Sequence, residues 1–148
     1  WSTGNLEANL AACAAAGVQL IEQPLKASDD EILAAIAHPV PICADESLHQ
    51  RTDLERLRRR YDAINIKLDK AGGLTEALAL AEEAQRQGFT IMVGCMLGTS
   101  LARAPAFLLT PRARFVDLDG PLLLARDRDP GLVFDGSVVR CPEPALWG

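Results

Sequence analysis

The sequence lacks the residue patterns that mark a zinc site or a disulfide framework. Its four cysteines, Cys13, Cys43, Cys95 and Cys141, are widely spaced, and they form no CxxC pair and no pairing with histidine. Structural zinc sites and disulfide-stapled folds need closely spaced ligands or regular cysteine pairs. We therefore expect free thiols and a reducing, cytoplasmic location.

Long apolar runs and clustered positive charge are absent as well. No apolar run approaches the ~18 to 20 residues that span a bilayer. The net charge is -5, and no stripe of lysine and arginine alternates with aromatic residues. The one basic cluster, Arg56–Arg60, lies beside Asp53 and Glu55, so we expect it to be a solvated helix face. Neither a membrane nor a nucleic acid is an expected partner.

What the chain does contain is enough apolar residues for a core. Its 148 residues are 49% hydrophobic and 24% charged, which is typical of one globular domain. The chain opens on Trp1 without an initiator methionine or a signal-like segment. We expect it to be a piece of a longer protein.

Helical and extended patterns alternate along the chain. We expect helices at 6–16, 28–37, 53–60, 74–87 and 101–109, and strands at 18–24, 40–46, 63–68, 89–95 and 114–120. Parallel neighbours need crossover connections, so this alternation predicts a parallel sheet covered by helices.

Local signals refine this prediction. Ser28 and Glu31 have the spacing of a capping box at the start of the second helix. Pro105 is expected to kink the last helix, and Gly72-Gly73 to allow a tight turn. Asp135-Gly136 lies between two short apolar runs, which is the pattern of a type I′ hairpin.

Polar or small residues recur at the ends of the predicted strands, every 22 to 28 residues. They are Glu22, Asp45, Lys67, the segment Gly94–Met96, and the pair Asp117 and Asp119. In parallel α/β folds, ligands bind at the carboxyl ends of the strands. We therefore expect these side chains to meet at one edge of the sheet.

Each of these residues has a plain and a chemical interpretation. Glu22 and Asp45 could each face solvent or cap a helix, but together they offer the hard oxygen ligands that Mg²⁺ prefers. Lys67 could extend out of the sheet, or could take up a proton if a cation-rich pocket lowers its pKa. Lys70 is expected to face solvent from a loop.

Five motifs in order, IEQPL, ICADES, NIKLDKAGG, MVGCM and VDLDGP, resemble the muconate-cycloisomerase branch of the enolase superfamily (mandelate racemase/muconate lactonizing enzymes). Within it they are most similar to the dipeptide epimerases. The resemblance runs from Trp1 to about Leu124. It implies the C-terminal part, about strands 4 to 8, of a (β/α) TIM-type barrel, which normally takes ~250 residues. The capping domain and the first barrel strands would then be absent from residues 1–148.

The resemblance also implies roles for individual residues. Glu22 and Asp45 match two Mg²⁺ ligands, and Lys67 matches an acid/base lysine. Asp117 and Asp119 match the pair that binds the α-ammonium group of a dipeptide such as L-Ala-D/L-Glu. Cys95 and Met96 are expected to contact the substrate. The implied reaction is metal-assisted removal of a proton α to a carboxylate, followed by epimerisation.

Other functions stay open at this point. N-acylamino-acid racemase, o-succinylbenzoate synthase and muconate cycloisomerase are enzymatic alternatives, and Asp117 and Asp119 disfavour them because two carboxylates would repel an acidic or acylated group. The pair could also merely cap the turn before Gly120. A non-enzymatic alternative is an assembly fragment of a split barrel. Exposed strand edges template association, so we expect a homo-oligomer or a complementing chain.

Overall fold

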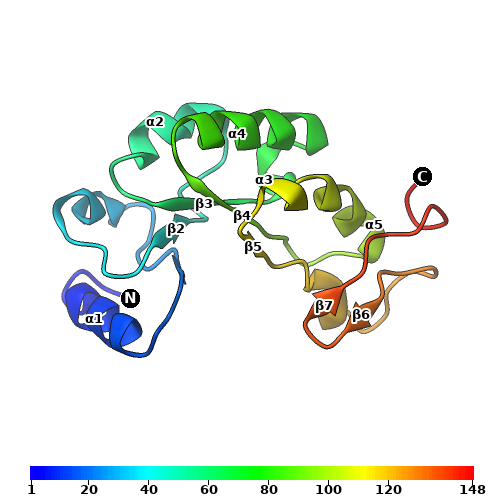
Figure 1. Ribbon diagram of the computed structural model, residues 1–148, viewed down its shortest axis with the longest axis horizontal. Helices are drawn as coiled ribbons and strands as arrows, with labels where there is room; N and C mark the ends of the chain where they lie inside the picture. Colours follow the sequence, from blue (N-terminus) through cyan, green and yellow to red (C-terminus); the bar gives the residue numbers. More distant parts are fainter.

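Five short strands form one curved parallel sheet in the computed structural model, which describes residues 1–148. The strands are β1 (Ile21–Glu22), β2 (Ile42–Ala44), β3 (Ala63–Ile66), β4 (Thr90–Val93) and β5 (Phe115–Val116), and they pair in sequence order. Every neighbouring pair is parallel. The sheet bends into an arch (Figure 1), which confirms the predicted part of a (β/α) barrel.

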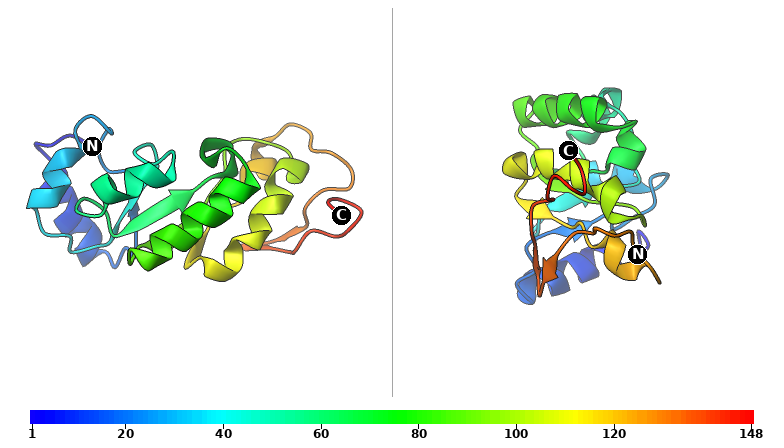
Figure 2. Two further views of the ribbon diagram at one scale, coloured as in Figure 1. Left: turned by 90° about the horizontal axis from the view of Figure 1, so that it is seen from above. Right: turned by 90° about the vertical axis from the view of Figure 1, so that its right-hand side faces the viewer.

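Helices connect the strands and lie mainly outside this arch. They are α1 (Leu6–Ala15), α2 (Leu54–Leu57), α3 (Leu68–Ala71), α4 (Leu74–Arg86) and α5 (Ser100–Arg103), and 3₁₀ helices cover Asp30–Ala35, Arg51–Asp53, Ala104–Leu108, Thr110–Arg112 and Gly120–Leu123. The two termini lie at opposite ends of the molecule (Figure 2). None of the helices combines the length and the apolar character needed to span a bilayer.

The two long helices end where glycine permits left-handed backbone. Gly17 follows α1 with φ +74°, and Gly88 follows α4 with φ +85°, as the sequence predicts. Helix α4 buries one face, made of Ala77, Leu80, Ala81 and Ala84. This face packs on the outside of the sheet.

The sheet has one thoroughly apolar face and one mixed face, because side chains alternate along each strand. The convex face contributes Ile42, Ile64, Ile66, Ile91 and Val93 to a core cluster of 25 buried residues. The concave face holds a smaller buried cluster of Cys43, Ala63 and Met92. Nearer the carboxyl ends of the strands, the concave face becomes polar.

The second predicted helix differs from its expectation. It is a 3₁₀ helix at Asp30–Ala35 with no side-chain cap, and Ser28 Oγ donates to Asp29 instead of forming a capping box with Glu31. The reason is Asp30, which is fully buried. Its carboxylate is held by groups distant in sequence, and these contacts fix the turn in place of local capping.

The basic cluster is exposed at Arg56, Arg58 and Arg59, as expected, and partly buried at Arg60. Arg60 Nη1 lies 2.6 Å from Asp30 Oδ1, and Arg56 Nη2 donates to the carbonyl oxygen of Ser47 at 2.9 Å. Arg60 thus pairs with the buried Asp30, and Arg56 binds the backbone of Ser47, whose side chain also contacts Asp30. The sequence could not show this, because Asp30 lies 30 residues before Arg60.

The remaining local predictions have mixed outcomes. The hairpin is present as β6 (Phe134–Asp135) and β7 (Val138–Val139). Its turn has positive φ only at Gly136, which fits type II′ and not the expected type I′. Pro105 begins a 3₁₀ helix and does not kink a continuous α-helix. All four cysteines are free, as expected.

We expect Asp30→Ala to lower the free energy of unfolding by about 3 kcal/mol or more, because it leaves the partly buried Arg60 and two hydroxyl groups without their partner. Glu31→Ala is the control, since the Glu31 side chain is 87% exposed; it should change stability by less than about 0.5 kcal/mol. Urea denaturation measures both variants. Equal losses for Asp30→Ala and Glu31→Ala would contradict the role given to the buried carboxylate.

Candidate functional site

Three of the predicted site residues converge at the carboxyl ends of neighbouring strands. Glu22 ends β1, Asp45 follows β2, and Lys67 follows β3. Lys67 Nζ lies 2.6 Å from Asp45 Oδ2. The charge of Asp45 acts on Glu22, and the charge of Lys67 acts on both acids. The three side chains therefore share one edge of the concave face.

The side chain of Asn65, on β3, holds the carboxylate of Glu22 across the intervening strand β2. Its Nδ2 donates to Glu22 Oε1 at 2.5 Å. Asn65 is 1% exposed, and its Oδ1 has no hydrogen-bond partner. The position of Asn65 depends on Gly94, because a Cβ at Gly94 would lie 2.5 Å from Asn65 Oδ1. Asn65 was not among the predicted site residues, although its spacing of two from Lys67 places both on the same face of the strand.

Lys70 also belongs to this site, and the expectation that it faces solvent is wrong. Helix α3 begins directly after Lys67, so one helical turn brings Lys70 back over the end of the sheet. Lys70 Nζ donates to the carbonyl oxygen of Asp45 at 2.5 Å and also contacts Asp45 Oδ1. The expected tight turn is present, with φ of +84° at Gly72 and +109° at Gly73.

The electrostatics of the two acids differ. Partial burial, together with the charge of Asp45, raises the pKa of Glu22. Burial alone would also raise the pKa of Asp45, but hydrogen bonds from Lys67 and Lys70 outweigh it and hold that pKa below its usual range. Of the two acids, Asp45 is therefore the one that more readily stays ionised.

The pKa of Lys67 is raised, and the lowering that is expected beside a bound cation stays a prediction. Burial lowers the pKa of Lys67, but its hydrogen bond to Asp45 and the charges of Asp45 and Glu22 outweigh burial. Two acids beside one lysine stabilise the ammonium form.

Asp117 and Asp119 lie together at the end of β5. The backbone N–H of Asp117 donates to Val93 O at 2.8 Å, which continues the strand ladder past Val116. Burial raises the pKa of Asp117, the charge of Asp119 raises it further, and the charge of Lys67 opposes both. Asp119 makes no side-chain cap to the 3₁₀ helix that follows, although the Asp117 carboxylate accepts from the backbone N–H of Asp119.

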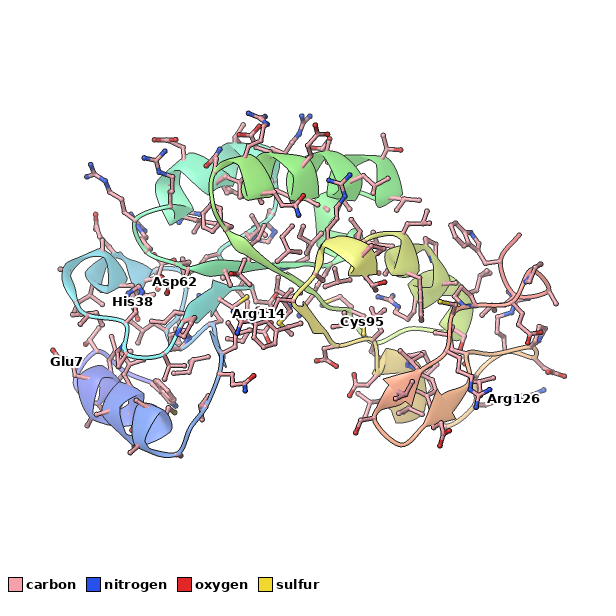
Figure 3. The ribbon with its side chains drawn as sticks, in the orientation of Figure 1. Glu7, His38, Asp62, Cys95, Arg114 and Arg126 are labelled. Carbon is pink, nitrogen blue, oxygen red and sulfur yellow. The ribbon has the colours of Figure 1, made fainter.

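Cys95 and Met96 lie in the loop that joins β4 to α5. The backbone N–H of Gly120 donates to Cys95 Sγ at 3.4 Å, and burial raises the pKa of that thiol. Cys95 lies near the end of β4, in the middle of the arch (Figure 3). Met96 is 48% exposed.

A buried arginine that the sequence analysis missed braces these loops. Arg103 of α5 is 2% exposed, and it donates to Asp69 of α3 through Nη1 at 2.7 Å and Nη2 at 3.1 Å. This two-point contact lowers the pKa of Asp69. It ties α3, and with it Lys70, to the next connection of the barrel. No sequence signal links positions that lie 34 residues apart.

The chain offers two metal-ligand candidates and no larger cluster. No group of three or more histidine, cysteine or acidic side chains lies in a metal-binding arrangement. A cavity of about 570 Å³ borders Glu22 and Asp45, and Trp1, Lys26 and Glu46 also line it. Glu22 and Asp45 could thus hold one side of a divalent cation.

Comparisons with known proteins place these features in context. A family model described as enolase C-terminal domain-like matches residues 1–143. N-acetyl-D-glutamate racemase of a Pseudoalteromonas species is 51% identical over 148 residues, which are 100% of this chain and 47% of that protein. L-Ala-D/L-Glu epimerase of Escherichia coli strain K12 is 54% identical over 134 residues, which are 90% of this chain and 42% of that protein.

Solved structures agree with these matches. One is an enolase family member from Agrobacterium tumefaciens with homology to dipeptide epimerases, solved with bound sodium and L-Ala-L-Glu. It has 63% sequence identity and a TM-score of 0.97, and the match covers 100% of this chain and 45% of that chain. A dipeptide epimerase from Methylococcus capsulatus, complexed with Mg and L-Arg-D-Lys, has 32% identity and a TM-score of 0.86, covering 96% and 43%. The chain thus spans 42 to 47% of the length of these proteins.

Gly94→Ala is expected to lower the free energy of unfolding by about 1 to 3 kcal/mol, because the added methyl group overlaps Asn65. Adding Asn65→Ala removes the overlap, so the double variant should be more stable than the sum of the single changes by about 0.5 to 3 kcal/mol. Gly4→Ala is the control, since a Cβ there meets nothing closer than 4.0 Å. Strictly additive losses in urea denaturation would exclude the contact.

Asp69 is expected to stabilise the fold at neutral pH and to lose this effect in acid. Arg103 lowers its pKa in the folded state, so below the unfolded-state pKa of about 3.9 the unfolded chain takes up a proton first. The stabilisation is therefore complete above that pH and falls as the pH drops through the folded pKa. Melting temperatures of the wild type and Asp69→Asn should converge as the medium is acidified. Parallel curves would contradict this prediction.

Proposed function

The chain belongs to the enolase C-terminal domain-like family, and we propose that it is the C-terminal part of an isomerase that epimerises dipeptides such as L-Ala-D/L-Glu. One observation carries this proposal. Two acids and a lysine meet at one edge of the sheet, and a second pair of acids, Asp117 and Asp119, follows β5 within range of the charge of Lys67. The N-terminal capping domain and the first barrel strands would come from residues outside positions 1–148.

Mg²⁺ is the cofactor that we propose for this site. Glu22 and Asp45 would hold it, since both are oxygen ligands at the ends of adjacent strands and Mg²⁺ is bound through one or two carboxylates with further ligands from elsewhere. Lys67 and Lys70 both pair with Asp45, which shows that the acids at this edge attract positive charge. When bound, Mg²⁺ supplies positive charge beside the substrate carboxylate, where negative charge develops as the α-proton leaves.

Lys67 is the proposed proton carrier. Its Nζ contacts Asp45 at 2.6 Å, and its charge partly opposes the burial that raises the pKa of Asp117. A proton carrier has to reach the reacting carbon directly or through one water. Epimerisation needs a carrier on each face of the planar intermediate, so Lys67 would serve one face and a residue of the preceding barrel strands the other.

Asp117 and Asp119 are the proposed site for the α-ammonium group of the substrate. The charge of Asp119 contributes to the raised pKa of Asp117, and a cation between the two carboxylates would relieve their repulsion. Each charge-assisted hydrogen bond to an ammonium group contributes roughly 1.5 to 3 kcal/mol. Cys95 and Met96 would line the path between this pair and Lys67. A dipeptide carries the required ammonium and carboxylate groups in one molecule.

Racemisation of an N-acylated amino acid is the second candidate, and the match to N-acetyl-D-glutamate racemase over the whole chain favours it. An N-acetyl group carries no positive charge, so it would leave the aspartate pair without a counter-ion. The same objection applies to o-succinylbenzoate synthase and muconate cycloisomerase. The aspartate pair is therefore the feature that distinguishes the two candidates.

Two further properties belong to this proposal. The four free thiols support a cytoplasmic location. Strands β1 and β5 are open edges of the sheet, which supports either a homo-oligomer or association with a complementing chain, including the assembly of a split barrel.

In the complete protein, Asp119→Asn should lower kcat/KM for dipeptides by at least about tenfold, which corresponds to ~1.4 kcal/mol of lost transition-state binding. N-acetylated amino acids should be affected less, because they present no ammonium group. Lys67→Ala should abolish epimerisation by removing the proton carrier on one face. Asp135→Asn in the hairpin is the control and should leave both rates unchanged.

Hydrogen–deuterium exchange at the substrate α-carbon, followed by NMR for dipeptides and N-acetylated amino acids, measures these effects. Faster exchange for N-acetylated substrates, or equal losses for both classes in Asp119→Asn, would favour the racemase instead.

A further inference from the structure

Gln23 has the most unusual backbone in the chain. It directly follows Glu22 and has a φ of +36°, and it is the only non-glycine residue with positive φ. It also precedes Pro24, which further restricts the backbone of the residue before it. Such strain persists only where surrounding contacts hold it, and it gathers at functional sites. The contacts of Gln23 therefore call for an explanation.

The side-chain amide of Gln23 joins the ends of β1 and β2. Its Oε1 accepts from the backbone N–H of Asp45 at 2.8 Å and from that of Ser47 at 3.2 Å. Its backbone N–H donates to Cys43 O at 2.9 Å. The ladder between the two strands thus continues through a side chain, and it ends on the backbone of Asp45. One residue fixes the spacing of the two candidate metal ligands.

The other end of the amide is anchored by hydroxyl groups of fixed direction. Ser47 Oγ and Tyr61 OH both donate to Asp30 Oδ2, at 2.7 Å and 2.9 Å. Asp30 is fully buried and paired with Arg60, so it can only accept. Burial raises the pKa of the Tyr61 hydroxyl, which keeps its proton in place.

Both hydroxyl oxygens are therefore left as acceptors, and they face a donor. Gln23 Nε2 lies within hydrogen-bond distance of Ser47 Oγ at 2.9 Å, Tyr61 OH at 2.8 Å and the carbonyl oxygen of Leu25 at 2.8 Å, and its two N–H groups are shared among these three acceptors. The site thus presents acceptors on one side of the amide and two backbone donors on the other. Only a side chain with both an N–H group and an oxygen satisfies this arrangement.

We propose that Gln23 is a positioning residue that sets the separation of Glu22 and Asp45 and thereby the affinity of the site for a divalent cation. This inference rests on the proposed function, since it takes the two acids to be metal ligands. Partners that orient metal ligands typically affect metal affinity by about 10- to 100-fold. The Asp30 network fixes the orientation of the amide, and the amide fixes the two strand ends.

The test is a titration of the complete, metal-free protein with Mg²⁺ by calorimetry. Gln23→Ala and Gln23→Gly both remove the amide, but glycine relieves the strain at positive φ. Both variants should raise the Mg²⁺ dissociation constant by about tenfold or more, while the glycine variant should have the higher melting temperature of the two. Saturating Mg²⁺ should restore kcat in both.

Gln23→Glu tests the polarity of the amide. A carboxylate places an acceptor against Ser47 Oγ, Tyr61 OH and Leu25 O, so its Mg²⁺ affinity should fall at least as far as that of the alanine variant. Gln19→Glu adds the same charge at an exposed position just before β1 and should change the affinity by less than about twofold.

Each result has a clear meaning. Wild-type affinity in the glycine variant, with a loss only in the alanine variant, would show that backbone conformation alone matters and would overturn the role of the amide. Wild-type affinity in both variants would overturn it as well. A wild-type protein that binds no Mg²⁺ would overturn both this inference and the proposed function, whereas Mg²⁺ binding that is insensitive to Gln23 would overturn the inference alone. If Gln23→Glu does not fold, the alanine and glycine pair still decides.

Discussion

The buried carboxylate of Asp45 is the constraint on which the rest of the site depends. A buried charge is costly unless it is paired and hydrogen-bonded, and Asp45 draws its partners from three different elements. Lys67 and Lys70 reach its side chain from the end of β3 and from α3, and Gln23 holds its backbone N–H from the end of β1. The contacts of the Asp45 carboxylate and backbone together therefore link the ends of β1, β2 and β3.

The charges on the concave face are separated into two regions. Lys67 and Lys70 lie with Asp45 beside β2 and β3, whereas Asp117 and Asp119 lie beside β5 with only each other and the more distant Lys67. The first region is nearly balanced, and the second is negative. A ligand with an ammonium group at one end and a carboxylate at the other would match this separation when a divalent cation adds positive charge to the first region. The proposed dipeptide substrate has this charge pattern, and an N-acylated amino acid has only half of it.

The sequence predicted the elements of the site better than the contacts that hold it. Alternating helix and strand patterns with a recurring polar residue at each strand end are local properties, and they were sufficient for the parallel order of the sheet and for the positions of Glu22, Asp45, Lys67 and Asp117. Gln23 and Arg103 could not be found in this way, because each binds partners more than 20 residues away. Lys70 was misplaced because the short helix α3 left no periodic signal over its four residues.

The apolar layer below the polar edge strengthens the interactions above it. Cys43 and Ala63 are fully buried on the concave face, and Met92 is nearly so. Burial strongly raises the pKa of the Cys43 thiol, so this cysteine remains neutral and behaves as a small apolar side chain. With water excluded from below, the charges of Glu22, Asp45 and Lys67 interact through a medium of lower polarity than bulk water. A polar side chain at Ala63 would weaken this exclusion of water, because it would bring an unpaired hydrogen-bonding group directly beneath the acids. The small, inert residues of β2 and β3 are thus part of the site, although none of them carries chemistry.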